Sequence, residues 1–276
     1  MSDSTNADRP TALVTGASRG IGRAIALALA NAGFDVAITA RTVHDGDATA
    51  FEPDTGVALP GSLDATAAAI RASGRRVVPI RLDLLELDAL ALSVETAIEG
   101  LGHLDVLVNN AIYVGPGGQC RFLETDPNEL VRRVVGNVTA QLLLTQRAVA
   151  HMVGRGAGLV LDISSGAGQL TPRHPVGEGG WTLSYAVTKA GFHRIADMVA
   201  LECGDSGVRA FNLNPGFVAT ERVRALEALA FVAERAIPSE VVGRVVAWFA
   251  TTGHHRFENG TYHQVPELAR ELGYRP

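Results

Sequence analysis

The sequence has little cysteine and no long apolar segment, and each shortage excludes a class of protein. Cys120 and Cys203 lie far apart and form neither a C-x-x-C pair nor a disulfide framework, so we expect two buried thiols. No run of about 18 apolar residues is present to span a bilayer, and the first residues lack the layout of a secretory signal. We therefore expect a cytoplasmic protein without membrane association.

An excess of basic charge is also missing. Lys plus Arg number 24 against 29 Asp plus Glu, which gives a net charge of −5. A chain with this charge has no electrostatic basis for binding nucleic acid or an anionic membrane, so we expect a small-molecule partner. The 276 residues are 47% hydrophobic and contain 30 glycines, which is typical of a compact α/β enzyme.

A glycine-rich turn lies between a predicted strand and a predicted helix near the start of the chain. The apolar run 11–14 precedes glycines at positions 16, 20 and 22, and the segment 23–30 is rich in Ala and Leu, which favour helix. Glycines here let the backbone approach a pyrophosphate, and free N–H groups at the helix N-terminus attract it. The spacing is not that of the general dinucleotide fingerprint, so a plain strand–helix connection is the alternative.

Predicted strands alternate with predicted helices along the whole chain. The expected strands are 11–14, 34–40, 77–82, 104–108, 158–163, 208–213 and 261–265, and the expected helices are 23–30, 62–74, 86–100, 126–151, 181–203 and 239–251. This alternation indicates βαβ units, and hence an α/β fold with a Rossmann-type doubly wound parallel sheet in a single domain.

The remaining segments fit around that domain. The composition predicts a flexible N-terminus at 1–9, one dinucleotide-binding and catalytic domain at 10–276, a surface insertion at 42–61 and a substrate flap at 216–238.

Arg41 ends the second predicted strand. In a dinucleotide fold an acidic residue near this point binds the ribose 2′-hydroxyl, whereas an arginine accommodates a 2′-phosphate. A guanidinium pairs with phosphate through two charge-assisted hydrogen bonds, and Arg19 adds a second positive charge. Arg41 therefore favours NADP(H) over NAD(H). The competing interpretation is a solvated strand end, because Asp45 and Asp47 follow.

Lys189 is the single lysine of the chain, and it follows Tyr185 by four residues in the predicted helix 181–203. Residues at this spacing are neighbours on one helix face, either as a catalytic pair or as a packed pair. An ammonium about 4 Å from a phenol favours the phenolate by about 4 kcal/mol at an effective dielectric near 20. That is enough to lower a tyrosine pKa by about three units, so the pair suits acid–base catalysis near neutral pH.

Taken in order, these motifs resemble the short-chain dehydrogenase/reductase family. The resemblance is carried by Thr-Gly-x-x-x-Gly-Ile-Gly at 15–22, Asn-Asn-Ala at 109–111, Asn137, the serines 164 and 165, Tyr-x-x-x-Lys at 185–189 and Pro-Gly-x-x-x-Thr at 215–220. It implies a catalytic tetrad of Asn137, Ser165, Tyr185 and Lys189, with Asn137 positioning a water and Ser165 holding the substrate oxygen. Ser165 is preferred to its neighbour because a glycine-containing turn follows it and adjacent strand residues face opposite ways.

The resemblance also implies the cofactor contacts, the partners and the reaction. The implied contacts are Gly16, Ser18, Arg19, Gly20, Ile21, Arg41, Asp83, Leu84, Asn110, Ala111, Tyr185, Lys189, Pro215, Gly216, Val218 and Thr220, and no metal is implied. The expected reaction is hydride transfer between NADP(H) and a small apolar carbonyl or alcohol, with Tyr185 as general acid/base. A homodimer or homotetramer packed through two long helices is expected.

Two alternatives stay open. One is reduction of a 3-oxoacyl thioester on an acyl carrier protein, for which Arg132 and Arg133 offer a basic pair, although a solvated helix face explains that pair as well. The other is a non-catalytic dinucleotide sensor on the same fold. Ile112 departs from the family pattern, which usually has glycine after Asn-Asn-Ala, and the C-terminus lacks the usual Asp-Gly-Gly.

Overall fold

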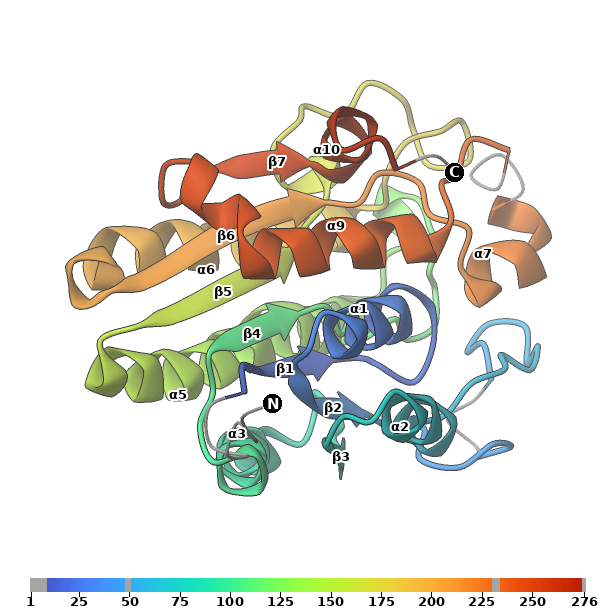
Figure 1. Ribbon diagram of the computed structural model, residues 1–276. Helices are drawn as coiled ribbons and strands as arrows, with labels where there is room; N and C mark the ends of the chain where they lie inside the picture. Colours follow the sequence, from blue (N-terminus) through green and yellow to red (C-terminus); the bar gives the residue numbers. More distant parts are fainter. Residues whose placement is uncertain (1–8, 48–50, 230–233, 275–276) are drawn as a thin grey trace.

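The apolar runs form seven strands of one parallel sheet, in the order β3-β2-β1-β4-β5-β6-β7 (Figure 1). The strands are β1 (Thr11–Thr15), β2 (Asp35–Ala40), β3 (Val77–Arg81), β4 (Val106–Asn109), β5 (Gly158–Ile163), β6 (Val208–Asn214) and β7 (Tyr262–Gln264). Because the order reverses between β1 and β4, a crevice opens at the carboxyl ends of these two strands. The expected Rossmann-type doubly wound sheet is confirmed.

The computed structural model describes residues 9–47, 51–229 and 234–274. The expected flexible N-terminus lies outside the described residues except for Arg9, as do parts of the expected insertion and flap.

Helices cover both faces of the sheet (Figure 1). One face carries α1 (Gly20–Asn31), α2 (Leu63–Ala72) and α9 (Ser239–Thr251), and the other carries α3 (Leu87–Leu101), α5 (Ala140–Arg155) and α6 (Leu183–Cys203). Alternate residues of a strand point to opposite faces, so Val14 packs in the core under the first group and Leu13 in the core under the second. Every residue of β1, β2 and β4 is buried, as expected for strands covered on both sides.

The predicted helix 126–151 is interrupted in the structure. Asp126 caps α4 (Pro127–Val134) by accepting a hydrogen bond from the Asn128 amide, and a π-helical turn, Val135–Thr139, then leads into α5. A π-turn widens the helix by one residue, a local irregularity that recurs at functional sites. Asn137, whose low helix propensity is noticeable in the sequence, lies in this turn.

The C-terminal part also differs from expectation. After β7 the chain continues into α10 (Val265–Glu271), whose second residue is a proline that suits the first turn of a helix. The flap contains α7 (Glu221–Ala225). The 3₁₀ turns are Phe122–Glu124, Gly166–Gly168, Gly204–Ser206, Glu227–Leu229 and Gly253–Arg256. Cys120 and Cys203 are partly exposed, so the expectation of buried thiols is wrong.

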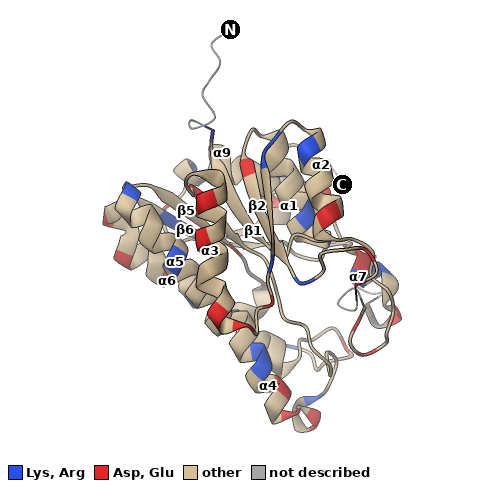
Figure 2. Cartoon of the chain, turned by 90° about the horizontal axis from the view of Figure 1, so that it is seen from below, with Lys and Arg blue, Asp and Glu red and all other residues tan. Residues whose placement is uncertain are grey.

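Basic and acidic positions are interspersed over the helices in the view of Figure 2. Among the described helices, none is both long enough and apolar enough to cross a membrane. In the same part of the chain, no three His, Cys, Asp or Glu side chains are grouped to hold a metal ion.

Candidate active site

A cavity of about 330 Å³ opens at the carboxyl ends of the central strands. Most of the predicted site residues line it: Gly16, Ser18, Arg19, Gly20, Ile21, Arg41, Asp83, Leu84, Asn110, Ala111, Tyr185, Lys189, Pro215 and Thr220. Four predicted residues, Asn137, Ser165, Gly216 and Val218, are not part of its wall.

Two glycines of the turn between β1 and α1 leave no room for a side chain. A Cβ atom on Gly22 would lie 2.2 Å from the carbonyl oxygen of Gly16, and one on Gly16 would lie 2.8 Å from the Cα atom of Ala111. The Asn110 side chain donates hydrogen bonds to the carbonyl oxygens of Thr15 at 2.9 Å and Gly16 at 3.3 Å. The end of β4 therefore holds a bare backbone cradle at the start of α1, which fits the pyrophosphate of a dinucleotide.

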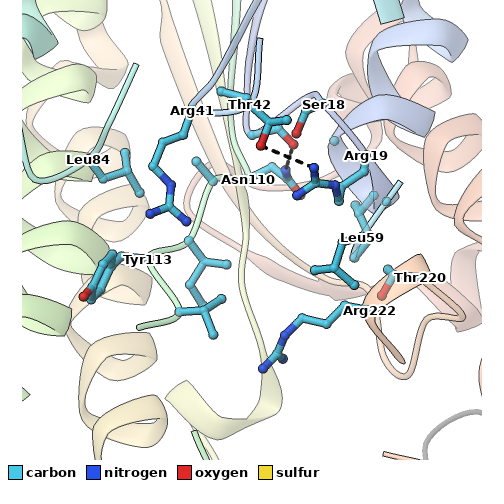
Figure 3. A pocket seen from close by; sticks show the side chains of 18 of the residues that line it. Ser18, Arg19, Arg41, Thr42, Leu59, Leu84, Asn110, Tyr113, Thr220 and Arg222 are labelled. Atoms are coloured by element: carbon cyan, nitrogen blue, oxygen red, sulfur yellow. Dashed lines mark hydrogen bonds between the residues drawn. The ribbon is translucent and has the colours of Figure 1, made fainter. Parts of the chain in front are cut away.

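Two arginines, Arg41 after β2 and Arg19 in the turn before α1, line the cavity on either side of Thr42 (Figure 3). Arg19 donates to the Gly61 carbonyl at 2.8 Å and to the Thr42 hydroxyl at 3.3 Å. Burial lowers the pKa of Arg19; the carboxylate of Glu221 opposes this shift and the charge of Arg41 adds to it. Two positive charges on one cavity wall are stabilised by an anionic ligand bound in the cavity.

Asp83 lies across the same cavity at the start of the β3–α3 connection. Its Oδ1 accepts a hydrogen bond from the Leu85 amide at 3.0 Å, which fixes the carboxylate in a local turn. Together with Leu84, another implied cofactor contact, it forms part of the cavity wall.

Tyr185 and Lys189 lie on consecutive turns of α6 and both face the cavity. The Thr182 side chain caps this helix by accepting from the Tyr185 amide at 3.3 Å. Lys189 Nζ donates to the carbonyl oxygen of Ile163 at 2.8 Å, which anchors the ammonium to the end of β5. The cap and this anchor orient the pair toward the cleft.

The protonation of this pair is governed mainly by burial. Burial lowers the pKa of Lys189 to about 8, against the opposing charge of Asp162. Burial raises the pKa of Tyr185, and a hydrogen bond with Ser165 opposes that shift. The expected lowering of the tyrosine pKa by Lys189 is not found, because burial raises this pKa and only the hydrogen bond with Ser165 opposes the shift.

The two serines after β5 have different surroundings. The hydroxyl of Ser165 lies beside the Tyr185 phenol and accepts a hydrogen bond from the Ala167 amide at 3.2 Å. Ser164 forms part of the cavity wall, but its Oγ lies 3.0 Å from Nδ1 of the buried His193. The Ser164 hydroxyl is thus engaged behind the wall, whereas that of Ser165 shares a site with the phenol.

The Asn137 side chain is held by the backbone of one residue, Tyr113. Its Oδ1 accepts from the Tyr113 amide at 2.6 Å, and its Nδ2 donates to the Tyr113 carbonyl at 3.0 Å. The expectation that Asn137 positions a water next to Lys189 stays a prediction. The Asn137 side chain holds the segment that follows β4 and places Tyr113 in the cavity wall.

Gly216 and Val218 support the turn after β6. Gly216 has φ of +69°, and its amide donates to Asn214 Oδ1 at 3.1 Å. Val218 is buried and forms an isolated parallel bridge with Ile237. These residues shape the turn that brings Thr220 to the cavity, where the Thr220 hydroxyl also caps α7.

Sequence reasoning missed Asp162. This carboxylate is fully buried on β5, level with Asn109 on β4 and Asn212 on β6. Asn109 donates to its Oδ1 at 2.8 Å, and Oδ2 has no hydrogen-bond partner among the described residues. Burial raises the pKa of Asp162 to about 7, and Lys189 opposes the shift. An acidic residue within an otherwise apolar strand was the signal for it in the sequence.

Comparison with known proteins gives consistent matches. Residues 10–229 match the family model described as short chain dehydrogenase. The chain is 31% identical to glucose 1-dehydrogenase 2 of Bacillus subtilis, over 76% of this chain and 72% of the relative. It is 30% identical to a 3-oxoacyl-[acyl-carrier-protein] reductase of Synechocystis, over 85% of this chain and 86% of that relative. A solved 3-oxoacyl-[acyl-carrier protein] reductase of Brucella melitensis in complex with NAD superposes with a TM-score of 0.74 at 27% identity, covering 95% of this chain and 98% of that one.

Proposed function

This chain belongs to the short-chain dehydrogenase/reductase family, and on that premise we propose that it interconverts a carbonyl and a primary or secondary alcohol on a small apolar substrate with NADP(H). The observation that carries the proposal is the grouping of the Tyr185 phenol, the Lys189 ammonium and the Ser165 hydroxyl beside a cradle that fits a dinucleotide.

The roles of these groups follow from their surroundings. When bound, the reduced nicotinamide supplies the hydride for the carbonyl carbon. Tyr185 donates its proton to the carbonyl oxygen as that oxygen gains charge, and Ser165 stabilises the same oxygen through a hydrogen bond. Lys189 stabilises the tyrosinate that remains, since an ammonium in a buried site favours a neighbouring anion. In alcohol oxidation each proton moves in the opposite direction.

Asn137 acts in this scheme as a positioning residue. Its side chain fixes both backbone groups of Tyr113, and it lies in the π-helical turn that joins α4 to α5. The part of the cavity wall that Tyr113 forms therefore depends on Asn137.

An apolar substrate is supported by one part of the cavity wall. Ile112, Tyr113 and Val114 follow β4 in this wall, and Leu59 lies on the opposite side (Figure 3). The carrier-protein alternative receives less support from Arg133, because this side chain is buried, pairs with Glu129 and donates to the Pro116 carbonyl. It is not available on the surface for an acidic partner.

Activity assays separate the candidate functions. We would assay apolar ketones, aldehydes and a 3-oxoacyl thioester with NADPH and with NADH. NADPH oxidation with an apolar ketone or aldehyde supports the proposal. Turnover confined to the thioester would mean the carrier-protein alternative, and dinucleotide binding without any turnover would mean a sensor.

Cofactor preference is expected to depend on Arg41. Each charge-assisted hydrogen bond to a 2′-phosphate contributes about 1.5–3 kcal/mol, and a carboxylate at this position repels the phosphate. Arg41→Asp is therefore expected to lower the ratio of kcat/KM for NADPH over NADH by about 100-fold, since about 1.4 kcal/mol corresponds to tenfold. Arg71→Asp, an exposed change on α2, is the matched control. An unchanged ratio in Arg41→Asp would remove this residue from cofactor selection.

We also propose that the protein forms a homodimer or homotetramer through α5 and α6. Val187, Met198 and Leu201 of α6 and Leu142 of α5 are large apolar residues that remain exposed, with Leu201 at 78%. Burying such side chains between copies is favourable. Light scattering is expected to report a mass two or four times the chain mass of 29.0 kDa, and Leu201→Glu is expected to lower it. A monomeric wild-type protein would contradict this.

A further inference from the structure

Part of the insertion between β2 and α2 reaches over the candidate cofactor cleft. We call residues 51–61 the strap. Phe51 and Ala58 form an antiparallel bridge, and the Glu52 amide donates to the Val57 carbonyl at 2.8 Å, so this part of the strap is a tight hairpin. Phe51, Glu52, Pro53 and Leu59 belong to the cavity wall. The strap is thus built into the cleft and is more than the surface loop expected from the sequence.

An ion pair with a buried carboxylate ties the strap to α7. Glu52 is 2% exposed, and its two carboxylate oxygens accept from Nε and Nη2 of Arg222 at 2.7 and 2.8 Å. Arg222 belongs to α7, 170 positions away in the sequence, and its side chain also borders the cavity (Figure 3). A buried carboxylate beside a site for phosphates is unfavourable unless it is paired, so this bidentate contact holds Glu52 in place.

Two further contacts fasten the strap to neighbouring loops. The Asp54 carboxylate accepts from the amides of Gly117 at 2.8 Å and Gly118 at 3.1 Å, in the segment that follows β4. At the other end, Arg19 of the glycine turn donates to the Gly61 carbonyl at 2.8 Å. The strap therefore joins loops that follow β1, β4 and β6 and spans the crevice between them.

We propose that the strap is part of the dinucleotide site and that the Glu52–Arg222 pair is a latch that opens each time the cofactor enters or leaves. The identity of the ligand rests on the proposed function; the latch itself rests on the contacts above. Since Arg222 lies on α7, opening of the cofactor cleft and displacement of α7 become one event. Cofactor exchange is then slowed by the latch in both directions.

Stopped-flow fluorescence of NADPH tests this directly. Glu52→Gln/Arg222→Gln removes one charge of each sign, so it breaks the latch without changing the net charge that acts on an anionic ligand. Association and dissociation are both expected to become about tenfold faster than in the wild type, because a latch of this kind is a barrier for entry and for exit. Acceleration of dissociation alone would identify a ligand contact and overturn the latch.

The single variants separate a latch from a simple charge effect. If the pair acts only through its charges, Arg222→Gln weakens the binding of an anionic cofactor and Glu52→Gln strengthens it. If the pair is a latch, both single variants accelerate dissociation. The dissociation rate of the double variant then exceeds that of each single variant by no more than about twofold, because breaking either side of the contact opens the same barrier. Opposite signs for the two single variants would overturn the proposal.

Two controls complete the experiment. Arg81 and Glu86 form an equally bidentate pair, at 2.9 Å for both contacts, but it is exposed and outside the cavity. Arg81→Gln/Glu86→Gln is expected to leave both rates unchanged. Asp54→Asn changes an exposed anchor of the strap and keeps the Glu52–Arg222 pair, so it tests the strap if the double variant folds poorly. We expect faster NADPH exchange in this variant as well.

The outcomes distinguish this inference from the proposed function. A wild-type protein that binds neither NADPH nor NADH overturns both. A wild-type protein that binds and turns over NADPH, but exchanges it at the same rates as the double variant and Asp54→Asn, overturns the latch alone.

Discussion

Replacing Tyr185 with phenylalanine is expected to reduce kcat by about 10³-fold while leaving the affinity for NADPH within about threefold. The substitution removes one oxygen atom, and with it the proton that the substrate oxygen needs, and general acid–base catalysis contributes about 10²–10⁴-fold. The cradle formed by the glycine turn and Asn110 is untouched. Initial rates with the best ketone of the panel and a fluorescence titration of NADPH measure the two effects.

Tyr262→Phe is the matched control for this variant. Tyr262 lies on β7, and its hydroxyl accepts a hydrogen bond from the Gln264 side chain at 3.2 Å, outside the cavity wall. This variant is expected to keep the wild-type kcat. If Tyr185→Phe retained full turnover, the mechanism proposed for this chain would be wrong.

Replacing Lys189 with methionine is expected to reduce kcat for carbonyl reduction by at least about 100-fold. Methionine fills a similar volume in a buried site, so the change removes chiefly the ammonium. The wild-type rate is expected to decline as the pH rises above about 8, because burial brings the pKa of Lys189 to about 8 and the positive charge beside the tyrosinate is lost there. In Lys189→Met this decline is expected to disappear. A pH profile of kcat for both proteins measures it.

Arg194→Met controls for the loss of a basic residue from the same helix. Arg194 is 71% exposed and pairs with Asp197 on the outside of α6, so we expect an unchanged kcat and an unchanged pH profile. Wild-type turnover in Lys189→Met would exclude the ammonium from the proton transfer.

The strands and most helices of this chain are predictable from local patterns. Apolar runs such as 106–109 and 158–163 form strands because burial on both faces of a parallel sheet selects such runs. Capping residues also act locally, because the side chains of Ser62 and Asp126 accept hydrogen bonds from backbone amides two or three positions further along the chain. The break in the predicted helix 126–151 was not predictable, because Asn137 bonds the backbone of Tyr113, 24 positions away.

Residues of the candidate site were predictable only where a local sequence pattern marks them. The glycine turn is marked by spacing, and the Tyr185–Lys189 pair is marked by helical periodicity and by the rarity of lysine. The surroundings of Ser164 and Ser165 depend on His193 and Tyr185, which approach from α6. Likewise, the shifted pKa values of Lys189 and Asp162 depend on how deeply each group is buried.

By itself, the sequence determined the sheet, the helix that carries the tyrosine and lysine, and the glycine turn, because propensity and periodicity act over a few neighbouring residues. Only the tertiary structure decided that Asn137 positions Tyr113, that Asp162 lies near the ammonium, and that Glu52 meets Arg222 over the cleft. Such contacts join segments that are distant in the sequence and adjacent only in the folded chain. The energy of such a contact depends on the burial and charge of the groups around it, and neither can be predicted from neighbouring residues in the sequence.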